Sequence, residues 1–326
     1  MPPPNSAPEA PTIPSPPHYS VVVPIHNEAG NLPSLHAEIT RAMSALGQST
    51  EIIFVNDGST DGSDAVLRGL PGVVVITLNR NYGQATALDA GFKHAQGRIV
   101  ISLDGDGQND PADIPLLLQK LEREDLDVVA GWRRDRKDQA RFLVLTRIGR
   151  AFRGLLIQDG VHDTGCTLRV YRREAVAALD IGGEMHRYIL ALLRWKGFRI
   201  GEVVVNHRPR IHGVSNYGMS KAVRGLIDLV YIWFLYKYSQ RPLHLYGYMS
   251  VTSFALAVVA LGYSAYAKIA LNLSLNRDGW FFLGFFCLLA AIMLFSFGIV
   301  IDLLIRIQLG TSPHEKRYYV REITET

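Results

Sequence analysis

The chain has 326 residues but only two cysteines, Cys166 and Cys287, which lie far apart in the sequence. Two isolated cysteines supply neither a disulfide framework nor a metal-ligand spacing, so a reducing compartment is expected. No G-x-G-x-x-G follows the first strand-like segment, and no P-loop lysine motif occurs. The usual dinucleotide-binding and P-loop folds are therefore excluded, and any bound phosphate must be held by something other than a glycine-rich loop. The familiar nucleic-acid-binding modules are also missing, so no nucleic-acid partner is expected.

The N-terminal segment lacks the apolar surface that would order it. Residues 1–17 contain eight prolines, so we expect residues 1–18 to form a disordered, partly polyproline-II tail. The same segment has neither the basic start nor the apolar run of a signal peptide. The catalytic part is therefore expected to stay in the cytoplasm.

The formal net charge of +4 is mild, but the basic residues are unevenly distributed. Lysine and arginine concentrate in residues 133–153, 194–224 and 306–321. Basic surfaces of this kind attract anionic membranes or phosphate-bearing substrates.

Two long apolar runs occupy residues 247–305. Residues 247–271 carry one charge, Lys268, and residues 280–305 carry one, Asp302. A helix of about 25 residues spans a hydrocarbon core of roughly 30 Å, so we expect two transmembrane helices. The alternative is a buried helix hairpin in a soluble protein.

Lysines and arginines flank this pair of runs on its outer sides, at Lys237 and Arg241 and again within residues 306–326. The positive-inside rule then places both ends in the cytoplasm and the short linker 272–279 on the other side. Residues 306–326 are accordingly expected to form a cytoplasmic C-terminal tail.

Residues 220–242 combine apolar positions at helical spacing with basic and aromatic neighbours. This pattern is typical of an amphipathic helix in the membrane interface. A helix packed on the soluble domain would show the same pattern, and the sequence leaves both interpretations open.

The preceding part of the chain alternates strand-like and helix-like segments. Apolar runs of this kind, interleaved with helices, predict an α/β domain over residues 19–219, with a mostly parallel sheet covered on both faces. Strands are expected within 19–30, 51–63, 73–79, 98–107 and 126–133, and helices within 31–47, 84–97 and 112–124.

Two acids stand at the end of the fourth expected strand, in the sequence ISLDGDGQND. Asp104 and Asp106 are one residue apart, and such carboxylates stay ionised together only beside a cation. Hard oxygen ligands in small number suit Mg²⁺ or Mn²⁺ bridged to a diphosphate, with Gln108 as a further polar contact. The alternative is a turn whose aspartates cap the helix that follows.

Other polar residues also follow strands, including His26, Glu28, Asp57 and Arg133. Asx-turn chemistry alone could account for the aspartate of VNDGSTDGS. Ligands of parallel sheets bind beyond the carboxyl ends of the strands, however, which is where all of these residues are expected.

The segments VPIHNE, VNDGSTDGS, GQATALDAGF, DGDGQ and GWR occur here in the order seen in family 2 glycosyltransferases, which have the Rossmann-like GT-A fold. Later segments, HDTGCTLRVYRRE, EMHRYI and NHRPRIHGVSNYG, together with the two apolar runs, resemble the polyprenyl-phosphate glycosyltransferases. These are relatives of dolichyl-phosphate mannose synthase and of bacterial undecaprenyl-phosphate glucosyltransferases. The resemblance covers about residues 19–322.

The resemblance implies a set of site residues. Those implied to bind the nucleotide sugar are Pro24, His26, Glu28, Asp57, Asp104, Gln108, Arg133 and Arg210. The metal ligands would be Asp106 and Asp104, with Gln108 beside them, and the acceptor phosphate would meet Arg141, Thr146, Arg147 and Ser215. The implied catalytic residues are Asp104, Asp106, Asp163 and Arg210.

Two positions need separate comment. Asn216 replaces a lysine of the family pattern, and Lys221 or Arg208 could supply the missing phosphate contact. Asp163 matches an aspartate often assigned as the catalytic base. A phosphate monoester has its second pKa near 6 and needs little deprotonation at neutral pH, so a positioning role for Asp163 is the main expectation.

The resemblance thus implies inverting transfer of a sugar to polyprenyl phosphate at the cytoplasmic face of the inner membrane. A UDP-hexose donor is expected because two-span relatives commonly use one; GDP-mannose is the alternative. Other interpretations are a family 2 transferase with a non-lipid acceptor and a non-enzymatic, membrane-tethered sugar-binding scaffold. Homo-oligomerisation is compatible with the sequence.

Overall fold

The structure is a computed structural model that describes residues 16–134, 160–181, 185–209, 233–234, 237–238, 242–271 and 279–311. The chain divides into two compact units, residues 1–226 and 227–326. Most of the expected interfacial helix 220–242, the tail 1–15 and residues 312–326 lie outside the described residues.

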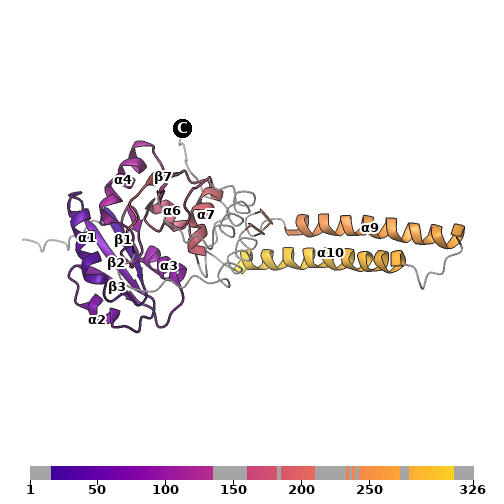
Figure 1. Cartoon of the computed structure of the whole chain (residues 1–326), viewed down its shortest axis with the longest axis horizontal. Coiled ribbons are helices and arrows are strands. Elements are labelled where there is room, and N and C mark those ends of the chain that lie inside the picture. The colour runs from indigo at the N-terminus through magenta and orange to yellow at the C-terminus, as the bar shows by residue number, and fades with distance from the viewer. Residues whose placement is uncertain are drawn as a thin grey trace, which may run out of the picture. The chain divides into compact units, whose positions relative to one another are not determined.

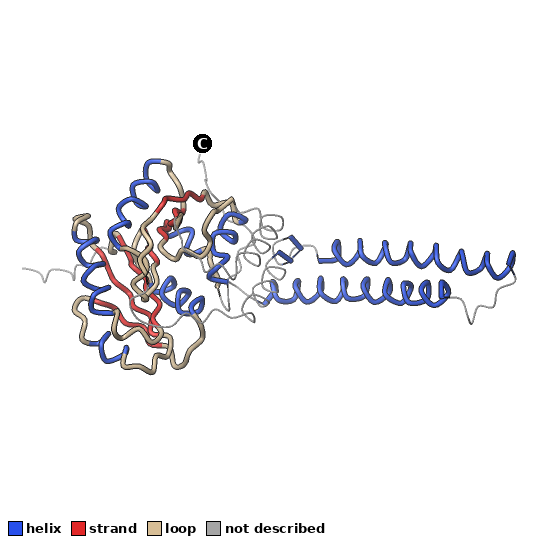
Figure 2. The backbone as a smooth tube through the Cα atoms, viewed as in Figure 1, coloured by secondary structure: helices blue, strands red, loops and turns tan. Residues whose placement is uncertain are grey.

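The first unit is built on a seven-stranded sheet with the strand order β3-β2-β1-β4-β6-β5-β7. Only β6 runs antiparallel to its neighbours β4 and β5, so the prediction of a mostly parallel sheet is confirmed (Figures 1 and 2). The five expected strands correspond to β1–β5, whereas β6 and β7 were not predicted. The strands are β1 (Tyr19–Ile25), β2 (Thr50–Asn56), β3 (Val73–Thr77), β4 (Ile99–Ser102), β5 (Val128–Trp132), β6 (Arg169–Arg172) and β7 (Ile200–Val204).

Helices cover both faces of this sheet (Figure 1). Alternate residues of β1 point to opposite faces. Val21 and Val23 belong to the same hydrophobic core as the buried residues of α1 and α4. Val22, between them, points to the other face and packs against Gly91 of α3. The helical elements are α1 (Leu32–Ser44), α2 (Ser63–Arg68), α3 (Gln84–His94), η1 (Pro111–Asp113), α4 (Ile114–Arg123), α6 (Arg173–Ala177), η3 (Met185–Tyr188) and α7 (Ile189–Trp195).

The parallel strands bring their carboxyl ends to one edge of the sheet. β1, β2, β4 and β5 all end there, and the antiparallel β6 begins there, with Arg169 opposite Ser102. The loops that carry the predicted site residues therefore start from a common edge, as expected for ligand sites in such sheets.

One turn at this edge requires glycine. Gly58, directly after β2, has φ +63°, and a Cβ placed on it would lie 2.5 Å from the backbone carbonyl carbon of Arg80. The chain that follows β3 therefore passes directly over the β2 turn, at a separation that no side chain could occupy.

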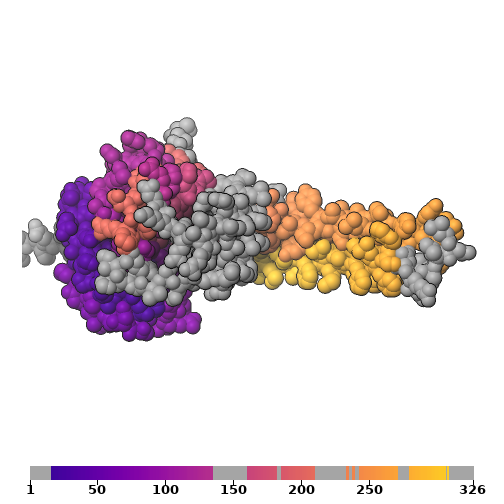
Figure 3. All heavy atoms as spheres, in the orientation of Figure 1, coloured from indigo at the N-terminus to yellow at the C-terminus, as the bar shows by residue number. Residues whose placement is uncertain are grey.

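The second unit contains two long helices, α9 (Pro242–Leu271) and α10 (Gly279–Thr311), which lie side by side along their length (Figures 1 and 3). Small residues of α9 allow the close approach. The hydroxyls of Ser250 and Ser253 donate to the carbonyl oxygens of Ala291 and Cys287, each at 2.8 Å.

Both helices are long and apolar enough to cross a membrane, over Pro242–Ala270 and Gly279–Ile305. Large apolar side chains are exposed on them, with Val251 69% and Ile269 84% accessible. A core hairpin of a soluble protein would bury such residues, so the pair is best described as candidate membrane spans. α9 begins five residues before the expected boundary at 247, and α10 continues to Thr311, past the expected 305.

Gly58→Ala should destabilise the first unit strongly, because it combines a left-handed backbone with a backbone clash. We expect a loss of about 3 kcal/mol in the free energy of unfolding. Gly72→Ala is the matched control, since Gly72 has φ +68° and open space around its Cβ position; it should lose only about 1 kcal/mol. Denaturant unfolding of the full chain in detergent measures both, and equal losses would contradict the close approach.

Candidate active site

A cavity of about 260 Å³ opens at the carboxyl edge of the sheet. Six of the residues predicted from the sequence lie in its wall: Pro24, His26, Glu28, Asp57, Asp104 and Asp106. They come from the ends of β1, β2 and β4, which are neighbours in the sheet. The predicted donor site has two parts: the loops that follow β1 and β2, and the paired acids after β4. The structure brings both parts into one cavity.

Asp57 is buried and anchors the loop that follows β3. Its two carboxylate oxygens accept the backbone N–H groups of Tyr82 and Gly83, at 2.7 and 2.8 Å. Charge-assisted bonds of this kind are strong, and they fix the entrance to α3 at the cavity wall. Asp57 therefore has a structural role in holding the loop after β3, in addition to the nucleotide contact that the sequence predicts.

His26 is oriented by two fixed partners. Its Nδ1 lies 2.8 Å from the carbonyl oxygen of Asp57, and the side-chain amide of Asn81 lies 2.9 Å from its Nε2. Because a carbonyl oxygen only accepts, Nδ1 carries the proton and Nε2 accepts from Asn81. Beside it, Glu28 accepts the side-chain amide of Asn31 at 2.6 Å.

Hydrogen bonds join the loop that follows β1 to the loop that follows β2. Asn27 stands in the left-handed region, with φ 58°, and its side-chain oxygen accepts the backbone N–H of Thr60 at 2.7 Å. In the opposite direction, the carboxylate of Asp61 accepts the backbone N–H of Ala29 at 3.0 Å. The cavity wall is therefore formed by loops that are held in place before any ligand binds.

Asp104 is surrounded by groups that the sequence did not identify. Gln84, the first residue of α3, donates its side-chain amide to Oδ1 at 2.6 Å, and Thr167 supplies a further side-chain hydrogen bond. Burial, and then the charge of Asp106, raise the pKa of the Asp104 carboxyl to about 6, against the opposing effect of Arg133 and Arg169. Burial is thus the main reason why the ionised form of Asp104 is disfavoured, and the charge of Asp106 adds to it.

Asp106 is also buried, and its Oδ1 accepts the backbone N–H of Gln108 at 3.0 Å. Between the acids, a Cβ on Gly105 would lie 2.4 Å from Cδ1 of Ile25, so this glycine lets the turn pack on the end of β1. Gln108 contributes to this turn through its backbone, whose carbonyl oxygen accepts the N–H of Arg208 at 3.0 Å.

The paired carboxylates fit a divalent cation, because they are neighbouring hard oxygen donors and a cation would favour their ionised forms against burial and mutual repulsion. Within the described parts of the chain, no cluster of three or more histidine, cysteine, aspartate or glutamate side chains could hold a metal ion. Asp106 and Asp104 would therefore supply only part of a coordination sphere, as is common for Mg²⁺ sites completed by phosphate oxygens and water.

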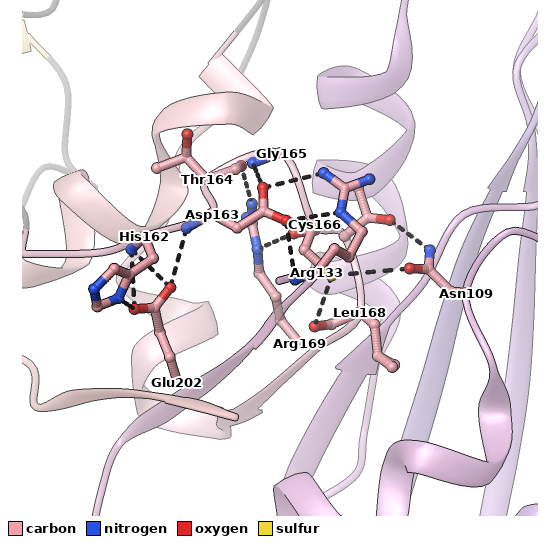
Figure 4. Close-up of polar contacts among 11 residues, drawn as sticks. Asn109, Arg133, His162, Asp163, Thr164, Gly165, Cys166, Leu168, Arg169 and Glu202 are labelled. Atoms are coloured by element: carbon pink, nitrogen blue, oxygen red, sulfur yellow. Dashed lines mark hydrogen bonds and ion pairs between the residues drawn. The ribbon is translucent and has the colours of Figure 1, made fainter. Parts of the chain in front are cut away.

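Arg133 and Asp163 form a two-point ion pair. Nε of Arg133 lies 2.7 Å from one carboxylate oxygen, and Nη2 lies 3.1 Å from the other (Figure 4). Burial alone would raise the pKa of the Asp163 carboxyl, but the Arg133 hydrogen bond and charge hold it below its usual range. An acid in this state is a weak base, and it orients the guanidinium of Arg133.

Arg169 is a buried residue close enough to act electrostatically on Asp104, and sequence reasoning did not identify it. It is 2% exposed, and its guanidinium donates to the carbonyl oxygens of Thr164, Cys166 and His186. Its charge opposes the rise in the pKa of Asp104 that burial and the charge of Asp106 cause, so it compensates part of the negative charge of the acid pair. Arginines are rarely buried to this extent, and nothing in the sequence RVYRRE distinguishes Arg169 from its neighbours.

Arg208, considered above as a substitute phosphate ligand, is already engaged. Its guanidinium lies 2.7 Å from Glu38 and 2.7 Å from Asp110. The remaining predicted residues lie outside the described residues: Arg141, Thr146, Arg147, Arg210, Ser215, Asn216 and Lys221.

Comparison with known proteins agrees with this geometry. The family model described as Glycosyl transferase family 2 matches residues 20–180. A dodecaprenyl-phosphate galacturonate synthase of Rhizobium johnstonii is 37% identical over 317 residues, which cover 93% of this chain and 92% of the relative. An undecaprenyl-phosphate 4-deoxy-4-formamido-L-arabinose transferase of Edwardsiella ictaluri is 35% identical over 285 residues, covering 85% and 83%.

Among solved structures, a glucosyl-3-phosphoglycerate synthase from Mycobacterium tuberculosis, in complex with Mn²⁺, UDP and glucosyl-3-phosphoglycerate, superposes with a TM-score of 0.53. The match covers 68% of this chain and 80% of that chain at 19% sequence identity. At this identity the likeness is one of fold.

A buried histidine near Arg169 should contribute stability that is lost in acid. Burial, with the charges of Arg187 and Arg169, lowers the pKa of His186 to about 4. Between that value and about 6.5 the unfolded chain binds a proton at this residue that the folded chain does not, so the contribution of His186 to stability falls by about 3 kcal/mol as the pH drops through this window. The raised pKa of Asp104 acts in the opposite direction, so the effect of His186 is measured as the difference between variants. His186→Gln should remove much of this loss. Thermal unfolding at pH 7 and pH 4.5 tests it, with exposed His94→Gln as the control; identical pH dependence in His186→Gln and the unsubstituted protein would contradict the assignment.

Proposed function

Because the chain belongs to glycosyl transferase family 2, among the polyprenyl-phosphate glycosyltransferases, we propose that it transfers a sugar from a UDP-hexose to a polyprenyl phosphate, with inversion, at the cytoplasmic face of the membrane. The observation that supports this proposal most is the cavity, because residues from the loops after β1 and β2 line it together with the paired acids. UDP-galacturonic acid is the first donor to test, since the relative matched over 93% of the chain is named for galacturonate.

The chemistry follows from the charges at the site. A phosphate oxygen of the acceptor attacks the anomeric carbon, the bond to the nucleoside diphosphate breaks, and negative charge develops on the leaving group. Asp106 and Asp104 would hold a Mg²⁺ or Mn²⁺ ion, which when bound supplies neutralisation of that charge. Arg133, held by Asp163, adds a fixed positive charge near Asp104. The site therefore acts by electrostatic stabilisation and positioning.

No strong base is needed in this scheme. The acceptor phosphate has its second pKa near 6, so it is mostly dianionic at neutral pH. Asp163 has its pKa held low and both oxygens engaged by Arg133. We assign Asp163 a positioning role.

The membrane helices serve the acceptor. A polyprenyl chain leaves the bilayer at a cost of about 0.8 kcal/mol for each exposed CH₂ group, so the enzyme must work at the membrane surface. The two candidate spans provide that attachment.

The central assay uses the full chain in detergent or nanodiscs, polyprenyl phosphate, Mg²⁺ or Mn²⁺, and a panel of labelled UDP- and GDP-sugars. We expect lipid-linked product with a UDP-hexose, and chelation of the metal should abolish it. Asp106→Ala should lower turnover by at least about 100-fold, while Asp180→Ala, an exposed acid, should not. Failure with every donor, or full activity without a divalent cation, would refute the proposal.

The role of Asp163 can be tested by Asp163→Asn. This nearly isosteric change removes the charge but keeps one acceptor for Arg133. We expect turnover to fall about 10- to 100-fold while the pH profile keeps its shape, because acceptor ionisation sets it. Steady-state kinetics from pH 5.5 to 9 measure this. Loss of all turnover at every pH, with both substrates still binding normally, would instead identify Asp163 as a base.

A further inference from the structure

Asp104 is held from two separate elements of the fold. Gln84, the first residue of α3, donates its side-chain amide to Oδ1 of Asp104 at 2.6 Å. The side chain of Thr167, in the loop before β6, supplies a second hydrogen bond. Asp106, by contrast, accepts the backbone N–H of Gln108, which belongs to its own turn. The orientation of the Asp104 carboxylate therefore depends on residues far from it in the sequence.

Thr167 is itself fixed through both its backbone and its side chain. Its carbonyl oxygen accepts the hydroxyl of Ser102, the last residue of β4, at 2.7 Å. Its Oγ1 accepts the side-chain amide of Asn109 at 2.9 Å. Ser102 and Asn109 are buried, at 2% and 4% exposure, which limits competition from water. Thr167 is thus tied to residues that precede and follow the acid pair in the sequence.

The contact with Asn109 determines where the Thr167 hydroxyl hydrogen points. A hydroxyl has one hydrogen to donate. Because the amide of Asn109 is the donor toward Oγ1, that hydrogen is available to the carboxylate of Asp104. The sulfur of Cys166 lies 3.9 Å from Oδ1 of Asn109 and 3.9 Å from the carbonyl oxygen of Leu168. Burial raises the pKa of this thiol to about 11, so it stays a donor, which favours the amide orientation with Oδ1 toward the sulfur (Figure 4).

Neutral donors suit the task of orienting a metal-binding acid. Gln84 and Thr167 carry no charge, so they fix the direction of the carboxylate without neutralising it. A carboxylate that is already oriented loses less conformational freedom when a cation binds. Hydrogen bonds from outside the coordination sphere commonly orient the ligands of metal sites in this way.

We propose that Gln84 and Thr167 are positioning residues for a divalent cation. They hold the carboxylate of Asp104 in the orientation that it presents to the ion together with Asp106. Asn109 keeps the Thr167 hydroxyl directed toward that carboxylate. This inference rests on the proposed function for the assignment of the two acids as metal ligands. It assigns none of the three supporting residues a direct bond to the ion.

The first test compares Thr167→Val with Thr167→Ser in the full chain in detergent. Valine has nearly the shape of threonine but no hydroxyl, whereas serine keeps the hydroxyl. Electron paramagnetic resonance measures free Mn²⁺ during a titration, with and without UDP, and loss of a bound ion in Asp106→Ala identifies the ion of the cavity. Thr167→Val should raise the Kd of that ion about tenfold, and Thr167→Ser should keep it within about twofold.

Gln84→Met should likewise raise the Kd of Mn²⁺ about tenfold, because methionine fills the same space without an amide donor. Gln96→Met, at an exposed glutamine, should not change it. Thr77→Val is the control for the hydroxyl, since Thr77 is a strand threonine that lies 3.5 Å from the carboxylate of Asp64 and is not a lining residue of the cavity. Thermal unfolding checks that each variant keeps the fold. Unchanged Mn²⁺ affinity in Thr167→Val and Gln84→Met would overturn the proposal.

A double substitution tests the role of Asn109. Asn109→Ala should weaken Mn²⁺ binding, and adding it to Thr167→Val should change the affinity little further, because the hydroxyl that Asn109 directs is already absent. Multiplication of the two single effects would show that Asn109 acts on the site by another route, which contradicts the proposal.

The Mn²⁺ titration needs no turnover, so it separates this inference from the proposed function. If the unsubstituted protein transfers no sugar from any donor, the proposed function fails, and the Mn²⁺ affinities of the Thr167 and Gln84 variants still decide the positioning role. If the protein transfers sugar but no bound Mn²⁺ is lost in Asp106→Ala, the transfer reaction stands and the positioning inference is refuted.

Discussion

Asp104 and Asp106 lie one residue apart at the end of β4, and burial together with their mutual repulsion disfavours the ionised form of Asp104. Gln84 and Thr167 donate hydrogen bonds to Asp104, while the charges of Arg133 and Arg169 oppose the rise in its pKa. These partners come from the start of α3, from the start of β6 and the loop before it, and from the residue after β5, so the sheet order determines which groups reach the acids. The compensation is incomplete, and this supports the proposal that a divalent cation binds between the two acids.

The donor side of the fold could be largely predicted from the sequence. β1–β4 are continuous apolar runs ending in polar turns, and periodicity together with turn residues identifies such strands. β6 and β7 could not be found in the same way. β6 is RVYR, in which a buried arginine begins the strand, and β7 contains Glu202, whose burial depends on a turn 40 residues away.

The same division holds for the site. Asp57, Asp104 and Asp106 belong to motifs whose spacing has chemical meaning, and the structure places them in the wall of one cavity. Asn81 and Arg169 stand in ordinary sequence contexts, and Gln84 lies in a quoted segment to which the sequence assigned no role; their positions at the site arise from tertiary contacts. A hydrogen bond between residues far apart in the sequence leaves no local sequence pattern. A single sequence therefore identifies residues expected to contact a ligand more readily than the residues that orient them.

The reversed direction of β6 has a consequence for how such a protein can change over time. β5 and β6 are antiparallel neighbours, so β5 ends and β6 begins at the same edge of the sheet. The connection between them therefore does not have to return to the opposite edge. Its length and composition can drift without altering any strand register, provided that the pairing at its base survives. β1–β4, which carry the paired acids, are joined by crossovers whose helices form the core, and they lack this freedom. The connection between β5 and β6 is thus free to vary, while the strands that carry the paired acids are not.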